Sequence, residues 1–408
     1  MKNREKNNIN YLVASRSISL VGDVLFDFAN HTFLANLAPN SLSLVAMYQA
    51  IERVVAVIFN MLGGVVADLS HRKRIIIITN LINGLFCIAF SFFKNENVLM
   101  YLVLVGNGIL SFMFAFSSPS YKALTKEIVG ERSIQRLNSY LETASTAIRL
   151  VLPIFSLLLY NLLKLQGVLL LNGISFIISS ILILCIEPLN FECTTANFSF
   201  KSIFFDMASG FRYIFDNKQI LFLIILSSLV NFFLAGYNLL LPYSHHMFIN
   251  LSDGLYGLFL TAEAIGGLFG AILSSRFKKD ASIFSLVVQL GVSSIFLIVT
   301  PFLYLIYKNK FLIMLGPGFF NLFLTIFNIQ FFSLIQKQVN NQYLGRVFGI
   351  IFTVAVLFMP IGTGVFSFFL DVSNLFNFPI IGASILILSL VFGCFMKYND
   401  QYNNYLSK

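Results

Sequence analysis

The chain has 408 residues, of which 57% are hydrophobic and only 11% are charged, against about a quarter charged in ordinary soluble domains. With 47 Phe residues and a mean hydropathy of +0.83, the polar side chains are too few to cover a water-soluble particle of this size. The composition therefore excludes a soluble enzyme and predicts an all-α polytopic membrane protein in contact with the lipid bilayer.

The net charge of +9 does not indicate a nucleic-acid partner, because the Lys and Arg residues are scattered over short loops and form no basic stripe. The four Cys residues have no paired spacing, so neither a disulfide framework nor a metal site is expected. The sequence also lacks a phosphate-binding loop, an HExxH helix and a GxSxG elbow. We expect no cofactor and no enzymatic activity.

Apolar runs of about 20 residues, long enough to cross a bilayer, recur twelve times along the chain. The first is too long for the core of a signal peptide and is interpreted as a membrane span. The predicted spans are, in chain order, 11–36, 42–66, 74–93, 98–120, 135–160, 166–186, 219–243, 254–275, 281–306, 311–335, 344–370 and 376–396.

The Lys and Arg residues are unequally distributed between the loops on the two sides of these spans. With the N-terminus inside, 21 of the 27 lie on the cytoplasmic side, and only Lys94, Lys164, Lys308 and Lys310 lie on the outer side. Because cytoplasmic loops are enriched in basic residues, this asymmetry predicts that both termini are cytoplasmic.

The longest loop divides the chain into two halves of six spans each. Within it, Ile203, Met207 and Phe211 recur at helical spacing with charged residues on the other face. This pattern favours an amphipathic helix on the inner membrane face, and the alternative is a plain solvated linker. The predicted parts are an N-terminal half, 1–187, a linker, 188–218, and a C-terminal half, 219–408.

Two landmarks recur at nearly the same offset in the two halves. A glycine-rich helix end followed by basic residues places Gly64 and Gly270 206 positions apart, and Pro153 and Pro360, expected to bend their helices, are 207 positions apart. A repeated offset indicates an internal duplication. Two duplicated six-helix halves are typical of alternating-access carriers, whose substrate site lies near the bilayer midplane.

The segment from Gly64 to Arg74, with the sequence GVVADLSHRKR, resembles the loop signature of the major facilitator superfamily, G-x-x-x-D-[RK]-x-G-R-[RK]. The resemblance implies that Gly64 allows close helix packing and that Asp68, Arg72 and Lys73 hold an inner gate closed. A simple positive-inside anchor is the alternative interpretation.

Further segments, Pro119 to Leu124 and Tyr343 to Phe348, are similar to the drug-exporter branch of that superfamily, which includes macrolide efflux proteins. The resemblance implies a proton-driven multidrug antiporter in a bacterial plasma membrane, which exports macrolide-like or other amphiphilic molecules. Leu152 stands where that branch has Gly before Pro153. Import by the same fold, or a carrier-derived receptor or assembly partner that no longer transports, are the alternatives.

Charged residues inside spans are functional candidates, because a charge at the bilayer centre costs at least about 2.5 to 3.5 kcal/mol. Repulsion between Asp23 and Asp27, one helical turn apart, favours a proton on one of them. We expect Asp23, Asp27 or Glu263 to carry the coupled proton and Arg149 to act as its electrostatic switch. A static ion-pair network is the alternative. The predicted coupling and cavity residues are Asp23, Asp27, Glu52, Arg53, Glu142, Arg149 and Glu263.

The seventh span contains candidate lining residues for an apolar pocket, Phe232, Phe233, Tyr237 and Asn238. Packing between helices or contact with lipid is the alternative for these rings. Because acids outnumber Arg at mid-depth, we expect a cationic or neutral small-molecule substrate, with protons as the coupled ion. The protein is expected to act as a monomer.

Overall fold

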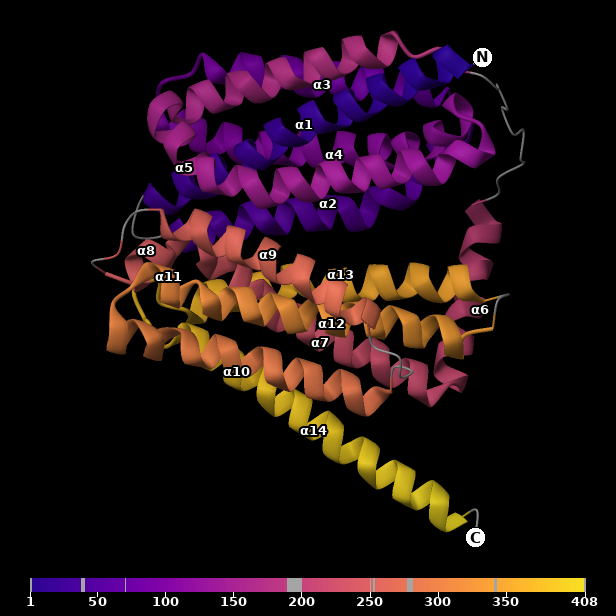
Figure 1. Cartoon of the computed structure of the whole chain (residues 1–408), viewed down its shortest axis with the longest axis vertical. Coiled ribbons are helices and arrows are strands. Elements are labelled where there is room, and N and C mark those ends of the chain that lie inside the picture. The colour runs from indigo at the N-terminus through magenta and orange to yellow at the C-terminus, as the bar shows by residue number, and fades with distance from the viewer. Residues whose placement is uncertain are drawn as a thin grey trace. The chain divides into compact units, whose positions relative to one another are not determined.

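The computed structural model describes residues 2–37, 41–69, 71–188, 200–249, 251, 254–276, 282–340 and 343–406 (Figure 1). Within these ranges all regular secondary structure is helical, which confirms the predicted all-α class. The chain divides into two compact units, Met1–Phe198 and Ser199–Lys408, which we call the N-terminal half and the C-terminal half and describe separately.

The N-terminal half is a bundle of long helices, indigo to magenta in Figure 1. The longest of them breaks at Lys164, whose φ of 56° and ψ of −178° are not helical. The break separates the arms 131–163 and 165–184. The helices are α1 (Lys2–Asn36), α2 (Ser41–Leu69), α3 (Arg72–Ser91), α4 (Glu96–Ile128) and α5 (Glu131–Leu184).

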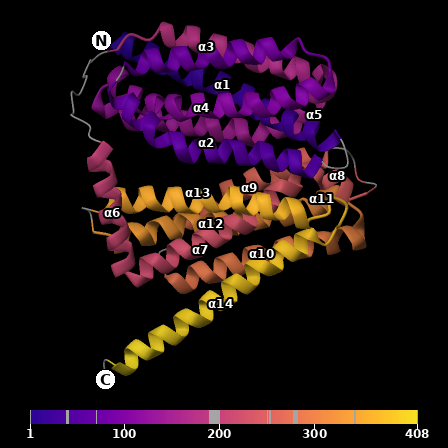
Figure 2. The same ribbon diagram turned by 180° about the vertical axis from the view of Figure 1, so that it is seen from behind.

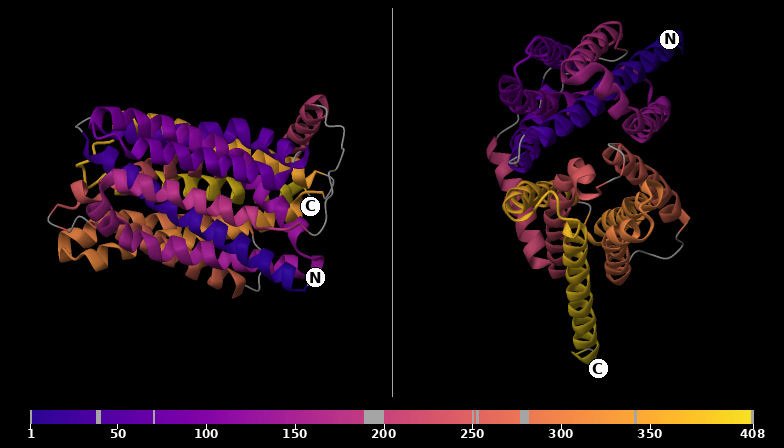
Figure 3. Two further views of the ribbon diagram at one scale, coloured as in Figure 1. Left: turned by 90° about the horizontal axis from the view of Figure 1, so that it is seen from above. Right: turned by 90° about the vertical axis from the view of Figure 1, so that its left-hand side faces the viewer.

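The C-terminal half contains the remaining helices, and its last helix, in yellow, extends beyond its neighbours in that half (Figures 2 and 3). Its longer helices are α6 (Phe200–Asp216), α7 (Lys218–Leu240), α9 (Leu255–Arg276), α10 (Ile283–Tyr307), α12 (Leu315–Gln338), α13 (Leu344–Phe369) and α14 (Asn377–Leu406). Three short pieces are η1 (Leu241–Tyr243), α8 (Ser244–Met247) and α11 (Lys310–Ile313).

The two halves pair their helices in the same way. In the N-terminal half α1 packs on α5, α2 on α4, and α3 on both α4 and α5. In the C-terminal half α7 packs on α13, α9 on α12, and α10 on both α12 and α14. This repeated pairing is what an internal duplication would produce.

A glycine permits a close approach of two helix backbones in each half. A β-carbon on Gly63 in α2 would lie 1.9 Å from the carbonyl oxygen of Ala115 in α4, and one on Gly266 in α9 would lie 1.9 Å from that of Gly318 in α12. Because backbone cannot yield as a flexible side chain can, both positions require glycine.

Within the described residues, ten helices are long and apolar enough to cross a membrane. This set omits α1, in which Asp23, Asp27, Asn30 and His31 interrupt the apolar run, and counts α5 once. The predicted total of twelve requires α1 as a span and the two arms of α5 as separate spans, so that total stays a prediction, as does the cytoplasmic location of the termini.

Large apolar side chains remain exposed on the surfaces of both halves. Leu162 is 72% exposed and Phe368 is 86% exposed. Buried side chains of the C-terminal half, including Phe320, Phe327 and Phe331, form its core. Apolar residues both inside and outside a helical bundle are expected where lipid replaces water as the solvent.

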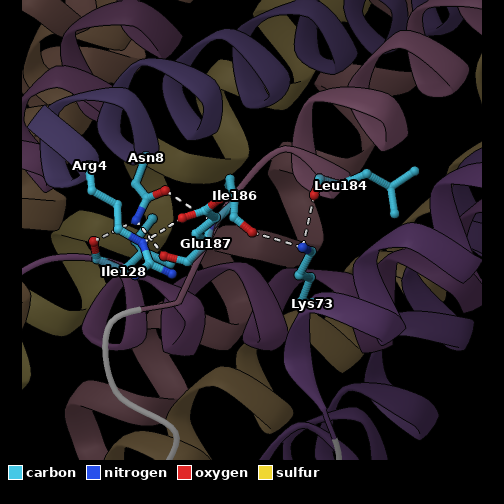
Figure 4. Close-up of polar contacts among 7 residues, drawn as sticks. All are labelled: Arg4, Asn8, Lys73, Ile128, Leu184, Ile186 and Glu187. Carbon is cyan, nitrogen blue, oxygen red and sulfur yellow. Dashed lines mark hydrogen bonds and ion pairs between the residues drawn. The ribbon is translucent and has the colours of Figure 1, made fainter.

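At one end of the N-terminal half, polar contacts join the start of α1 to the end of α4 and to the residues that follow α5 (Figure 4). Asn8 of α1 donates to the carbonyl oxygens of Ile128, at 3.1 Å, and Glu187, at 2.8 Å, and accepts from the Glu187 amide. Arg4 Nε forms an ion pair with Glu187 Oε2 at 2.7 Å. These bonds satisfy backbone groups that the ends of α4 and α5 would otherwise leave unpaired.

The predicted linker, 188–218, includes α6, which belongs to the C-terminal half and packs against α13. Arg346 Nη1 donates to Ser209 Oγ at 2.9 Å, and the rings of Tyr213 and Tyr343 stack 4.5 Å apart. The predicted apolar positions Ile203 and Met207 lie outside the described side chains. The location of α6 at a membrane face stays a prediction.

Candidate functional site

A cavity of about 310 Å³ inside the N-terminal half is lined by three carboxylates. Asp23 and Asp27 lie on the same face of α1 because they are four residues apart, and Glu52 faces the cavity from α2. Asn60, Asn83, Asn107, Ser111, Arg16 and Arg149 add polar atoms, and Leu20, Val24, Phe26, Ala56, Leu110, Phe114 and Phe176 complete the wall. We call this space the acidic chamber.

Asp27 is held by a hydrogen-bond chain from its own helix and α2. The Tyr48 hydroxyl donates to Asp27 Oδ1 at 3.0 Å, and Asn30 Nδ2 donates to the same hydroxyl at 3.1 Å. Asn107 Nδ2 from α4 donates to the Tyr48 carbonyl oxygen at 2.7 Å. Since Tyr48 is fully buried, these bonds fix the carboxylate at the chamber wall.

His31 lies one turn beyond Asp27 and takes a defined tautomer. Its Nδ1 lies 2.8 Å from the Asp27 carbonyl oxygen, which can only accept, so Nδ1 carries the hydrogen. Its Nε2 lies 3.3 Å from Gln49 Nε2 and accepts from that amide in the neutral ring. The imidazole thus stiffens α1 beside the carboxylate without entering the chamber wall.

Arg149 lines the acidic chamber from α5. Among the described residues, ion pairs join Arg4 to Glu187 and Arg72 to Glu127, and none involves Arg149. Arg53 is half-buried on α2 and is not part of the chamber wall. The chamber therefore brings three carboxylates and two Arg residues, Arg16 and Arg149, close together without a direct ion pair among these described residues.

A larger chamber of about 650 Å³ adjoins the first, since Arg16, Leu20 and Arg149 line both. Lys122 and Lys126 of α4 and Glu142 of α5 also line it. Its other lining residues are Leu12, Ser118, Tyr121, Thr125, Ile134, Asn138, Leu141 and Ser145. We call this space the basic chamber, because four cations face one carboxylate.

Glu263 lies in the C-terminal half, on α9, and is paired with a tyrosine as Asp27 is. The buried Tyr237 of α7 donates a short hydrogen bond to Glu263 Oε1. Asn321 Nδ2 of α12 donates to the Glu263 carbonyl oxygen at 2.7 Å. Each half therefore holds a carboxylate against a phenol.

The predicted aromatic pocket residues of α7 pack against other rings. Phe232 lies 5.2 Å from Phe366 and 5.4 Å from Phe233, and Tyr237 lies 5.0 Å from Phe320, all measured between ring centroids. Tyr237 is buried and Asn238 is half-buried. A substrate-binding role for these side chains stays a prediction.

The gate motif is described only in part. Arg72 at the start of α3 forms an ion pair of 2.6 Å with Glu127 near the end of α4, and both side chains are 14% exposed. Lys73 Nζ donates to the carbonyl oxygens of Leu184 and Ile186 (Figure 4). Gly64 and Asp68 lie outside the described side chains.

The two prolines predicted to bend helices both lie inside helices, Pro153 in α5 and Pro360 in α13. The recorded break in α5 falls at Lys164 and not at Pro153. A Pro removes one backbone donor from the helix ladder, and bending at these two positions stays a prediction.

Several residues at the site could not be recognised from the sequence. Tyr48 and Asn30 belong to no motif, and Tyr48 contacts Asp27 only because of how α1 and α2 are aligned. In the sequence, Lys122 and Lys126 cannot be distinguished from ordinary loop lysines. Arg16 has the same appearance, since it lies near the basic start of the chain.

A protein of apolar helices, with two similarly paired halves and ionisable groups around an internal cavity, has the features of a membrane transporter. The family model of the Major Facilitator Superfamily matches residues 12–363. The chain belongs to this superfamily and is a multi-pass membrane transporter of small molecules, not an enzyme.

Similar proteins agree with this classification. The chain is 23% identical over 371 residues to Macrolide efflux protein A of Streptococcus pyogenes, covering 88% of each chain. It is 24% identical over 312 residues to the protein of that name from Enterococcus faecalis, covering 73% of this chain and 92% of the relative.

Solved transporters share the fold at low sequence identity. A bacterial homologue of the iron transporter ferroportin, in an inward-facing state, gives a TM-score of 0.75 at 16% identity, covering 94% of this chain and 97% of that one. The nucleoside transporter NupG gives a TM-score of 0.71 at 15% identity, covering 95% and 98%.

Proposed function

We propose that this protein is a proton-coupled exporter of hydrophobic or cationic amphiphiles, which works by alternating access in a bacterial plasma membrane as a monomer. The observation that carries the proposal is the acidic chamber, where Asp23, Asp27 and Glu52 line one cavity without direct ion pairs among the described residues. Carboxylates at membrane depth that face a cavity are suited to exchange a proton for a cationic ligand.

The hydrogen bonds around Asp27 supply a way to link these two events. When Asp27 is ionised, Oδ1 accepts from Tyr48 and the negative charge attracts a cation in the chamber. When Asp27 is protonated, that attraction is lost and the cation is released. Arg149, which lines the same chamber, would favour the ionised state.

The relatives named for macrolide efflux support export as the direction and amphiphilic drugs as the substrates. Glu263, held by Tyr237 in the C-terminal half, is our second candidate for proton binding. Both carboxylates are bound by a buried phenol, so each can change charge without losing its position.

The test is accumulation of macrolides and fluorescent cationic dyes in a pump-deficient bacterial host. The expected result is lower accumulation with the wild-type protein, loss of the effect with an uncoupler, and loss with Asp27→Asn. Asp371→Asn is the matched control, because Asp371 is an exposed loop residue whose carboxylate accepts from the backbone amide of Ser373, two residues away. Unchanged accumulation of every compound, with the protein present in the membrane, would refute drug export. Raised accumulation would indicate import.

A further inference from the structure

We propose that the basic chamber of the N-terminal half binds the phosphate or carboxylate group of an amphiphilic ligand. The charge of its wall is the first argument. Arg16, Lys122, Lys126 and Arg149 face the space, and Glu142 is the one carboxylate among the residues that line it. Lys122 and Lys126 line this space alone, and Arg16 and Arg149 are shared with the acidic chamber. A concave, partly apolar wall on which two lysines stand beside two Arg residues attracts anions.

The second argument is that no direct ion pair within the described residues holds any of the four cations. None of them forms an ion pair with a carboxylate in the part of the chain that the structure describes. Arg16 is also held in place, since its guanidinium carbon lies 5.5 Å from the Phe114 ring centroid and 5.2 Å from that of Tyr121. Lysines near a membrane surface are common, but a guanidinium between two rings is an ordered binding group.

The third argument is size and chemical character. The volume of about 650 Å³ lies within the range of roughly 300 to 1,000 Å³ typical of small-molecule sites. Leu12, Ile134 and Leu141 supply apolar surface, and Ser118 and Asn138 supply hydrogen-bond donors. This combination fits a ligand with an anionic group and a hydrophobic body.

The fourth argument is the contrast with the acidic chamber. Arg16 and Arg149 line both cavities, whereas the two lysines line only the basic chamber and Asp23, Asp27 and Glu52 line only the acidic chamber. The acidic chamber suits a cation, whereas the basic chamber repels one. The inference therefore extends beyond the proposed export of cations, and it is tested by binding alone, without transport.

The experiment uses the full chain in phosphatidylcholine nanodiscs, with the fluorescence of 1-naphthyl phosphate as the readout and 1-naphthylmethylammonium as the cationic counterpart. We expect saturable binding of the phosphate and none of the ammonium compound. Each of Lys122→Gln and Lys126→Gln should weaken binding about fivefold, the effect of one charge at about 4 to 5 Å in a largely hydrated site. Lys94→Gln, an exposed lysine outside the chamber, is the matched control.

Glu142→Gln provides a change of opposite sign. Removing this carboxylate should tighten phosphate binding about threefold, a gain that a misfolded protein would not give. Competition by dihexanoyl phosphatidylglycerol but not by inorganic phosphate would assign the site to a lipid-like anion, and competition by both would assign it to any phosphate. The proposal would be overturned by a lack of saturable phosphate binding, by equal binding of the ammonium compound, or by unchanged affinity in both lysine variants.

Discussion

The bond between Tyr48 and Asp27 offers a quantitative test of the acidic chamber. Tyr48→Phe removes one hydroxyl, which donates to Asp27 Oδ1 at 3.0 Å and accepts from Asn30 Nδ2 at 3.1 Å. Hydrogen bonds to charged groups contribute about 1.5 to 3 kcal/mol in water-soluble proteins, and bonds between membrane helices average about 0.6 kcal/mol. We expect a coupling energy between Tyr48 and Asp27 of about 1 to 2 kcal/mol.

The assay is a double-mutant cycle of Tyr48→Phe and Asp27→Ala, in which the free energy of unfolding is measured by titration from neutral detergent into SDS. Tyr48→Phe alone should destabilise by about 1 to 3 kcal/mol, because it also leaves Asn30 with a buried donor. Tyr101→Phe, which changes an exposed tyrosine, is the control and should be neutral. A coupling energy near zero would refute the assignment of Tyr48 as the residue that holds Asp27.

Three further predictions concern stability, measured by the same unfolding titration. Arg72→Ala should cost about 3 kcal/mol, because it leaves the Glu127 charge buried, and the double variant with Glu127→Gln should cost less than Arg72→Ala alone. Gly266→Ala should destabilise by about 1 to 3 kcal/mol or more. Gly267→Ala is its control and should be nearly neutral, because the added β-carbon would have ordinary contacts at 3.4 Å. Equal effects of the two variants would contradict the close approach of α9 and α12. Asn8→Ala should cost about 1 to 3 kcal/mol by leaving the Ile128 and Glu187 carbonyl oxygens unpaired, and an unchanged unfolding midpoint would contradict that role.

The helical class could be predicted from the sequence because it depends on composition and on apolar runs, which are local properties. The positions of the helix ends could be predicted less accurately than the helical class. α4 continues to Ile128, past the predicted end at 120, because a helix need not stop where the apolar run stops. This extension carries Lys122 and Lys126 onto the wall of the basic chamber instead of into a loop.

The site shows the same division between local and long-range information. Asp23 and Asp27 were expected on one face because four residues make about one helical turn, and both line the acidic chamber. Tyr48, the hydrogen-bond partner of Asp27, could not be inferred, since spacing within one helix does not determine which residue of the next helix lies opposite. Likewise, nothing local links Glu263 to Tyr237, 26 residues away on another helix.

Transport by the purified protein tests proton-coupled export through the acidic chamber most directly. The protein would be reconstituted in liposomes with an acidic lumen, and uptake of ethidium would be followed, since this permanent cation cannot be trapped by protonation. We predict uptake that requires the protein and the pH gradient, is abolished by Asp27→Asn and is retained by Asp371→Asn. Uptake that does not depend on the gradient, or that persists in Asp27→Asn, would contradict proton coupling through the acidic chamber.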